Sequence, residues 1–413
     1  MKNKGFTLIE LLSVIIIISV TSLIIFPNIA KVINDSKEKL YIAQILDIEK
    51  ASEKWATDNL DKLDNNHVND IYISLESLRY SGYLEPNQIK NPKDRSVMDG
   101  CIQIRYNVDN KKYNYVYQEK TCDRYAQDTN GDGDFGYVIY SYDRSSKLFV
   151  KDTASNEVLS TGVAIYEKEK SNLKVVGQTD SGLYDLGDEY VFRGTDVNNY
   201  VTLTGFDDEG NSRNSSWRIL SIDKKSNVVR LISTTQIATN AWDSNNKLSF
   251  RESSLNNLLL SKIDESSVAF NSKKIINYDY KIGKVESNEI SIDALKSLLS
   301  STSEVDNTSS QKVGTISVLD YVNASASDCD SNFLSDICAT NNYLKDMFTS
   351  NGTTWTINTS SDQVWSINDT GLLSLTAPSN NKKIYAVVAL DSNSYISNID
   401  TATGTSANPY IIK

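Results

Sequence analysis

The longest run of apolar positions in the chain lies close to its N-terminus. It covers residues 6–26, starting at Phe6, and contains a single charged side chain, that of Glu10. A helix of this length measures about 30 Å, which matches the hydrocarbon core of a bilayer. We therefore expect a transmembrane helix over 6–26. Because a carboxylate inside such a segment is costly, Glu10 is a candidate functional residue.

The pattern beyond Pro27 is that of an amphipathic helix. Apolar side chains recur at a spacing close to 3.6 residues, at Tyr41, Ile45, Ile48 and Trp55, and charged residues occupy the other faces. The chain becomes polar over 58–66, where this helix should end. We predict one N-terminal helix over 6–60, roughly 80 Å long, whose second half packs against a sheet.

Shorter β-type runs follow the helix and predict a small globular head over 61–175. Residues 74–82 have the pattern of a short helix, with Ser74 as its N-cap. Residues 101–107 and 112–118 predict a hairpin, and 137–142 and 147–151 predict two further strands. We expect these strands to form a small antiparallel sheet on the helix.

A polar and glycine-rich stretch over 167–187 predicts a domain boundary, with a second, distal domain over 181–413. Short β-type runs in this domain include 190–192, 200–203, 217–222, 228–233, 313–319, 364–367 and 385–390. Helix-like stretches at 253–260 and 290–299 lie between them. Strands, then helices, then strands indicate an α+β fold. We expect Trp217, Trp355 and Trp365 to be core residues, not sugar-stacking platforms.

Composition excludes some classes of function. The chain of 413 residues has a net charge of −11 and a single histidine. The acidic balance argues against nucleic acid as a partner. One histidine rules out a metal cluster built from several histidines and disfavours histidine-dependent catalysis.

Four cysteines fall into two local pairs, Cys101 with Cys122 and Cys329 with Cys338. Neither pair has the CxxC spacing of a zinc or redox motif. In an exported protein this arrangement favours two disulfides, the first closing the open end of the hairpin. Free buried thiols are the alternative.

An acidic loop at 128–134 has the pattern that begins a calcium-binding loop. Oxygen side chains occupy its alternate positions, namely Asp128, Asn130, Asp132 and Asp134, and a glycine stands at the sixth position. The twelfth position is Ile139, where a calcium loop of this type has a bidentate glutamate. We predict a possible Ca²⁺ site, with a solvated turn as the alternative.

The N-terminal residues resemble the signal of type IV pilins and pseudopilins. That signal is a short basic leader (here with Lys2 and Lys4), a glycine, the run Phe-Thr-Leu-Ile-Glu, and then an apolar helix. The resemblance implies a leader over 1–5, cleavage by a prepilin peptidase between Gly5 and Phe6, and N-methylation of Phe6. It also implies that Glu10 neutralises the N-terminus of a neighbouring subunit and that Pro27 kinks the helix. A plain membrane anchor is the alternative.

The distal residues resemble an extracellular bacterial domain similar to C-type-lectin-like and formylglycine-generating-enzyme-like folds. The similar segments are 216–220, 228–233, 313–321, 355–358, 364–365 and 404–410. In such enzymes a reactive cysteine pair performs the chemistry. Here Cys329 and Cys338 lie in a polar loop without an evident base, so we expect no enzymatic activity.

These resemblances together imply a minor type IV pilin, at the tip of a filament or decorating it, which presents a distal binding or adhesion domain. The expected partners are other pilin subunits, a prepilin peptidase, the cytoplasmic membrane before assembly, and an unknown surface glycan or protein. The basic leader places the C-terminus outside the cell. We expect ligand contacts within 323–348 and 358–362. The alternatives are a pseudopilin of a secretion or DNA-uptake system and a pilin-anchored exported enzyme.

Overall fold

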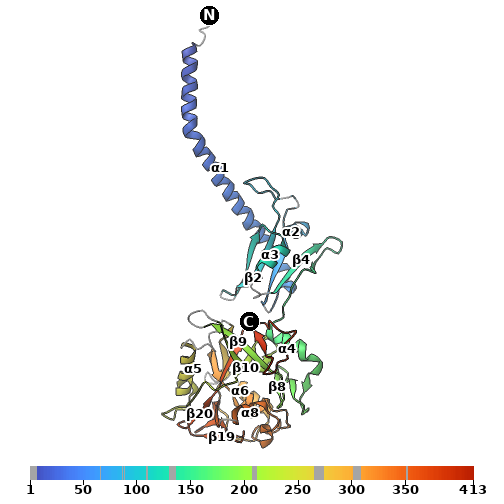
Figure 1. Cartoon of the computed structure of the whole chain (residues 1–413), viewed down its shortest axis with the longest axis vertical. Coiled ribbons are helices and arrows are strands. Elements are labelled where there is room, and N and C mark those ends of the chain that lie inside the picture. The colour runs from blue at the N-terminus through green and yellow to red at the C-terminus, as the bar shows by residue number, and fades with distance from the viewer. Residues whose placement is uncertain are drawn as a thin grey trace. The chain divides into compact units, whose positions relative to one another are not determined.

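The computed structural model describes residues 7–65, 67–85, 87, 89–107, 110–129, 136–206, 212–264, 274–300, 308–349 and 352–413. The chain divides into two compact units, Met1–Val158 and Leu159–Lys413, which Figure 1 shows in blue to green and in green to red. We call them the proximal and the distal unit.

One long helix, α1 (Leu8–Asp58), opens the proximal unit and confirms the prediction of a single N-terminal helix. Thr7 is its N-cap, and the 3-10 turn η1 (Leu60–Lys62) follows it. Across the ranges given above, no helix combines the length and the apolarity that crossing a bilayer requires. The expected transmembrane character of 6–26 is therefore not confirmed.

The proximal sheet has the strand order β3-β2-β1-β4-β5. Its strands are β1 (Asn69–Ser74), β2 (Cys101–Asn107), β3 (Lys112–Gln118), β4 (Gly136–Asp143) and β5 (Leu148–Lys151). The expectation of a purely antiparallel sheet is wrong, because the central strand β1 pairs in parallel with β4. Sequence analysis missed β1, a short strand that begins with the polar residues Asn69 and Asp70.

The second half of α1 packs on this sheet as predicted. Ile48 and Trp55 are fully buried, in one cluster with Ile71 and Ile102 of the sheet. Two short helices complete the unit, α2 (Leu75–Tyr80) and α3 (Cys122–Thr129). Ser74 caps α2 by accepting a hydrogen bond from the Ser77 N–H, as its position in the sequence predicts.

The distal unit begins earlier than the predicted boundary at 175–181. Its first helix, α4 (Thr161–Glu169), contributes Ala164 and Ile165 to the distal core. The Thr161 N–H donates to the Ser394 carbonyl at 2.8 Å, which fixes this helix to the C-terminal part of the chain. The charged stretch after residue 167 is thus the surface of this unit and not a linker.

A ten-stranded sheet forms the body of the distal unit, with the main order β13-β21-β11-β10-β8-β7-β6. Strand β16 also pairs with β21, β9 with β10, and β22 with β9. The strands are β6 (Lys174–Val175), β7 (Gly182–Asp185), β8 (Glu189–Arg193), β9 (Tyr200–Phe206), β10 (Ser212–Asp223), β11 (Val229–Ser233), β13 (Ile275–Ile276), β16 (Val313–Thr315), β21 (Ala386–Leu390) and β22 (Tyr410–Ile412).

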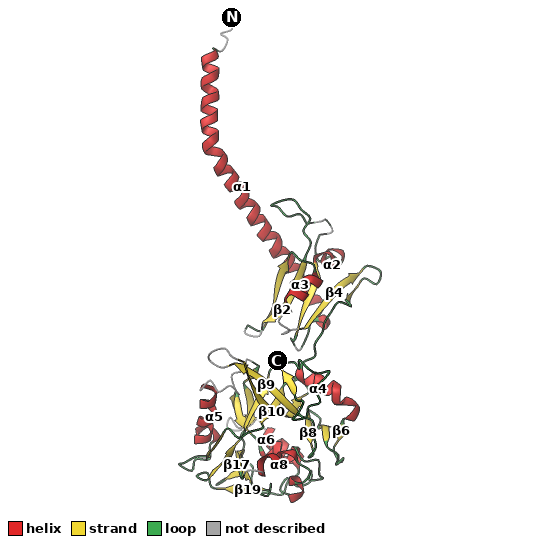
Figure 2. Ribbon diagram, in the orientation of Figure 1, coloured by secondary structure: helices red, strands yellow, loops and turns green. Residues whose placement is uncertain are grey.

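Two smaller sheets and several short helices pack around this sheet (Figure 2). One sheet has the order β12-β20-β17-β18-β19, and the other pairs β14 with β15. Their strands are β12 (Ala238–Ala241), β14 (Tyr278–Lys281), β15 (Thr308–Gln311), β17 (Thr354–Thr359), β18 (Val364–Ile367), β19 (Leu373–Thr376) and β20 (Asn381–Ile384). The helices are η2 (Lys170–Asn172), η3 (Phe250–Glu252), α5 (Ser254–Asp264), α6 (Ile292–Ser300), α7 (Val318–Asn323), η5 (Asp336–Ala339) and α8 (Tyr343–Thr349).

The distal unit is therefore a mixed α and β structure, as predicted. Trp217, Trp355 and Trp365 are all buried in its core, which confirms their expected role. The predicted strand at 313–319 is wrong in its second half. It stops at Thr315 because Ser317 and Asp320 form a capping box that starts α7.

Candidate functional site

A reciprocal capping arrangement fixes the first turn of α1. The Thr7 hydroxyl accepts a hydrogen bond from the Glu10 N–H at 3.3 Å, and the Glu10 carboxylate accepts from the Thr7 N–H at 2.9 Å. The Thr7 hydroxyl also donates to the same carboxylate oxygen at 2.8 Å. Two of the N–H groups that a helix start leaves unsatisfied thereby find partners.

This arrangement occupies only one oxygen of Glu10. Every one of these hydrogen bonds to the carboxylate reaches Oε2, and Oε1 has no hydrogen-bond partner in the part of the chain that the structure describes. The side chain is exposed, as are its apolar neighbours Leu8, Ile9 and Leu11. The N-terminal turn thus presents an oriented carboxylate on an apolar surface.

The remaining predicted residues of this segment have different outcomes. Gly5 and Phe6 lie outside the described residues. Pro27 lies within α1, which continues through it to Asp58. The implied cleavage, N-methylation and kink stay predictions.

Residues 1–26 match the prokaryotic N-terminal methylation motif. The N-terminal segment is therefore similar to the prepilin signal of type IV pilins or pseudopilins. Such a signal implies pilin subunits and a prepilin peptidase as partners. It also suggests that the protein is located on a membrane-anchored pilus or at the cell surface. No curated protein and no solved structure matches the chain.

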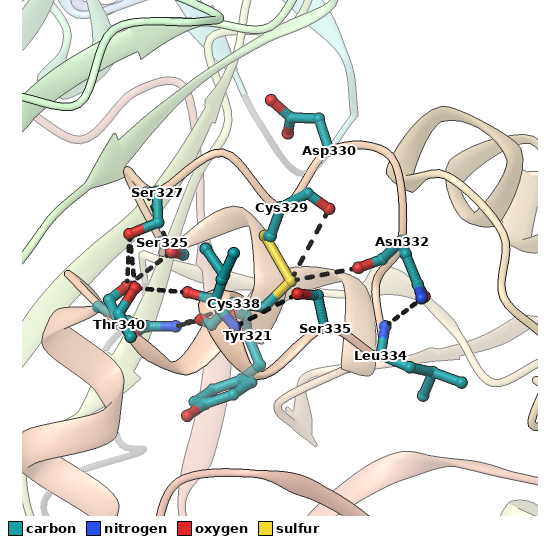
Figure 3. Close-up of a disulfide and its surroundings, with 12 residues drawn as sticks. Tyr321, Ser325, Ser327, Cys329, Asp330, Asn332, Leu334, Ser335, Cys338 and Thr340 are labelled. Atoms are coloured by element: carbon teal, nitrogen blue, oxygen red, sulfur yellow. Dashed lines mark hydrogen bonds between the residues drawn. A yellow bond between two sulfur atoms is a disulfide. The ribbon is translucent and has the colours of Figure 1, made fainter.

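Both predicted disulfides are present. Cys101–Cys122 joins the first residue of β2 to the first residue of α3, and Cys329–Cys338 closes a short loop of the distal unit. Figure 3 shows this loop held on its other side by Ser325 and Ser327. The Ser325 hydroxyl donates to the Thr340 carbonyl, and the Ser327 and Thr340 hydroxyls lie 2.7 Å apart. This loop is therefore held in place by a disulfide and by hydrogen bonds of its own residues.

The calcium prediction falls mostly outside the described residues. Asp128 belongs to α3, whereas Asn130, Asp132 and Asp134 lie in the range 130–135, which the structure does not describe. Elsewhere in the described ranges, no group of three or more His, Cys, Asp or Glu side chains is arranged to hold a metal ion. Calcium binding at 128–134 stays a prediction.

The cavities of the distal unit lie mostly outside the loops that were predicted to contact a ligand, and ligand contact by those loops stays a prediction. Two neighbouring cavities are lined from β8, β14, α6 and α7, and they share Glu189 and Lys296. Of the predicted loops 323–348 and 358–362, only Asn323 and Asp330 line either cavity. One indication of these cavities in the sequence is a lone charge inside an apolar run, namely Arg230 between Val229 and Leu231.

Proposed function

We propose that this protein is a minor subunit of a type IV pilus that presents its distal unit as a binding module. The observation that supports the proposal is the methylation motif over residues 1–26, together with the carboxylate of Glu10 at the start of α1. Cleavage after Gly5 would leave the amine of Phe6 as the new N-terminus.

The geometry at Glu10 suits the proposed role. An ammonium and a carboxylate in an apolar helix bundle each require the other, because an unpaired charge there is strongly disfavoured. The capping box already orients the carboxylate through Oε2 and leaves Oε1 for the amine of a neighbouring subunit.

The size of the distal unit supports a low-copy position. It spans Leu159–Lys413, which is more of the chain than α1 and the proximal sheet together. A unit of this size on every subunit would crowd a regularly packed shaft. A tip or decorating position avoids this crowding and leaves the distal unit accessible to ligands.

The N-terminal residue of the protein in sheared surface filaments tests the proposal. We expect a start at N-methylated Phe6, measured by intact mass and N-terminal peptide mass. A processed Phe6 start that is absent from sheared filaments and co-purifies with a secretion machine would favour a pseudopilin instead. An intact Met1 start confined to the membrane fraction would refute processing and assembly together.

A further inference from the structure

An unusual group of polar side chains lies on one face of the large distal sheet. Glu189 of β8 is the register partner of Asp223 of β10, and Ser221 is the partner of Arg230 in β11. Opposite residues in antiparallel strands share a face, as do residues two apart along one strand. These four residues therefore form a polar floor on a sheet whose core is otherwise largely apolar.

Three residues of this floor, Glu189, Asp223 and Arg230, line one side of a cavity of about 200 Å³. Helix α6 contributes Lys296 and Ser300 to the lining, and α7 contributes Asp320. Strand β14 contributes Tyr278, Tyr280 and Lys281. The strand register of β10 and β11 shifts between Ile219 and Ser221, directly before the floor. Such bulges are enriched beside functional sites because they re-aim side chains.

Arg230 is a buried cation in the wall of this cavity. Its two terminal nitrogens bind Asp320 at 2.7 and 2.8 Å, and its guanidinium lies 5.2 Å from the centre of the Tyr278 ring. The third nitrogen, Nε, is buried and its N–H has no hydrogen-bond partner in the described ranges. A buried donor without a partner is costly, so the fold alone leaves a polar group of this cavity wall unsatisfied.

The charges around the cavity decide the class of ligand. Arg230 is neutralised by Asp320, and Lys296 lies 3.2 Å from Asp188. The remaining lining groups carry both signs, Glu189 and Asp223 against Lys281. An anion would meet these carboxylates and a cation would meet the lysines, so neither is favoured. A neutral molecule with several hydroxyl groups can both donate to the carboxylates and accept from the cations.

We propose that this cavity binds one neutral sugar residue, the terminal unit of a surface glycan. Its volume lies below the roughly 300–1,000 Å³ of pockets for larger ligands, which favours a single ring over an oligosaccharide. The inference rests on the proposed function only in that the distal unit is a binding module. It does not depend on cleavage or filament assembly.

The test uses the full chain purified in a detergent without a sugar headgroup. Methyl glycosides of glucose, galactose, mannose and N-acetylglucosamine are the probes, and saturation-transfer NMR and calorimetry measure binding. We expect at least one probe to bind the wild type. Glu189→Leu should weaken that binding at least tenfold, because it removes a hydrogen-bonding group, and Glu189→Gln should restore most of it.

Asp328→Leu is the matched control, since Asp328 is an exposed carboxylate in the loop that sequence analysis favoured. It should leave binding unchanged. If Glu189→Leu does not fold, Lys296→Met takes its place with the same expected loss. The proposal is overturned if no probe binds, if binding is insensitive to the cavity variants, or if Asp328→Leu abolishes it. Binding of triglycine in place of all four sugars would also overturn it and would indicate a peptide ligand.

This experiment is independent of the test at Phe6. If the chain binds sugar but starts at Met1, the sugar site is supported and filament assembly is refuted. If the chain starts at Phe6 but binds no sugar, only filament assembly is supported.

Discussion

Arg230 and Asp320, which are 90 positions apart in the sequence, form a bidentate ion pair inside the distal unit. Both side chains are largely buried, with 13% and 10% of their surface exposed. Asp320 also accepts hydrogen bonds from the N–H and hydroxyl of Ser317, so it closes the capping box of α7 at the same time. One carboxylate thereby links β11 to the start of α7.

Breaking this pair should destabilise the distal unit strongly. We expect Asp320→Asn to reduce the free energy of unfolding by about 3–5 kcal/mol, because it leaves the Arg230 charge buried without a partner. The double change Arg230→Met with Asp320→Asn should recover part of this loss. Denaturant unfolding of the four proteins of this cycle measures the coupling. Purely additive losses would show that the two residues do not stabilise each other.

The same pair should make stability depend on acid. Burial alone would raise the pKa of Asp320, but Arg230 and the Ser317 hydrogen bonds hold it below its ordinary value. A carboxyl whose pKa is lowered by folding stabilises the protein above its unfolded pKa of about 3.9, and this contribution disappears as the pH falls further. The wild type should therefore lose stability below about pH 4 more steeply than the double variant, as measured by melting temperature against pH.

Glu10 should be required for assembly and not for cleavage. We expect Glu10→Ala to be processed normally after Gly5 but to be lost from sheared filaments, because the neighbouring N-terminus would lack its counter-charge. Immunoblots of membrane and sheared fractions measure both steps. Ser13→Ala is the control, since the Ser13 hydroxyl donates a hydrogen bond to the Ile9 carbonyl of its own helix. Normal filament incorporation of Glu10→Ala would contradict the proposed pairing.

Glu189 should make stability fall as the pH rises. Burial raises the pKa of Glu189, and the nearby Asp320 adds to the effect while Arg230 opposes it. A carboxyl whose pKa is raised by folding stabilises most below its unfolded pKa of about 4.3 and loses this contribution as the pH rises through its folded pKa. Glu189→Gln should therefore gain stability relative to wild type as the pH rises above about 4. A constant difference across this range would show that Glu189 titrates normally.

Removing the Cys101–Cys122 disulfide should destabilise the proximal unit. The bond closes a loop with a sequence separation of 21, for which chain entropy predicts a loss of about 3 kcal/mol in the double serine variant. Calorimetry measures the shift in melting temperature. The Cys329–Cys338 disulfide closes a loop with a sequence separation of only 9. Its replacement by two serines should therefore reduce the free energy of unfolding by less. Equal stability with and without reductant would indicate that the bond does not stabilise the fold.

Calcium binding at 128–134 has a direct test. If the loop binds Ca²⁺, the cation should raise the melting temperature of the wild type, and Asp132→Ala should remove this shift, because ligand binding stabilises the folded state by mass action. Asp336→Ala changes an acidic residue of the distal loop and is the control. A wild-type melting temperature that ignores both calcium and chelator would refute the site.

Local patterns predicted much of the secondary structure. The 3.6-residue spacing after Pro27 identified α1, and alternating runs identified β2, β3 and β18 at their observed bounds. The errors occurred where a local pattern was ambiguous. Residues 313–319 have the composition of a β-strand, yet the capping box of Ser317 and Asp320 divides them into a strand and a helix.

Sequence alone determined the N-terminal motif, the long helix, the cysteine pairs and the α+β character, because each depends on residues that are close together in the chain. Tertiary structure alone decided the parallel pairing of β1 with β4, the limit of the distal unit at Leu159, and the cavity around Arg230. These features depend on segments far apart in sequence, such as β11 and α7, and no local pattern specifies which strands become neighbours or which charges meet. A lone arginine in an apolar strand indicated a special position, but only the folded chain showed that Asp320 is its partner.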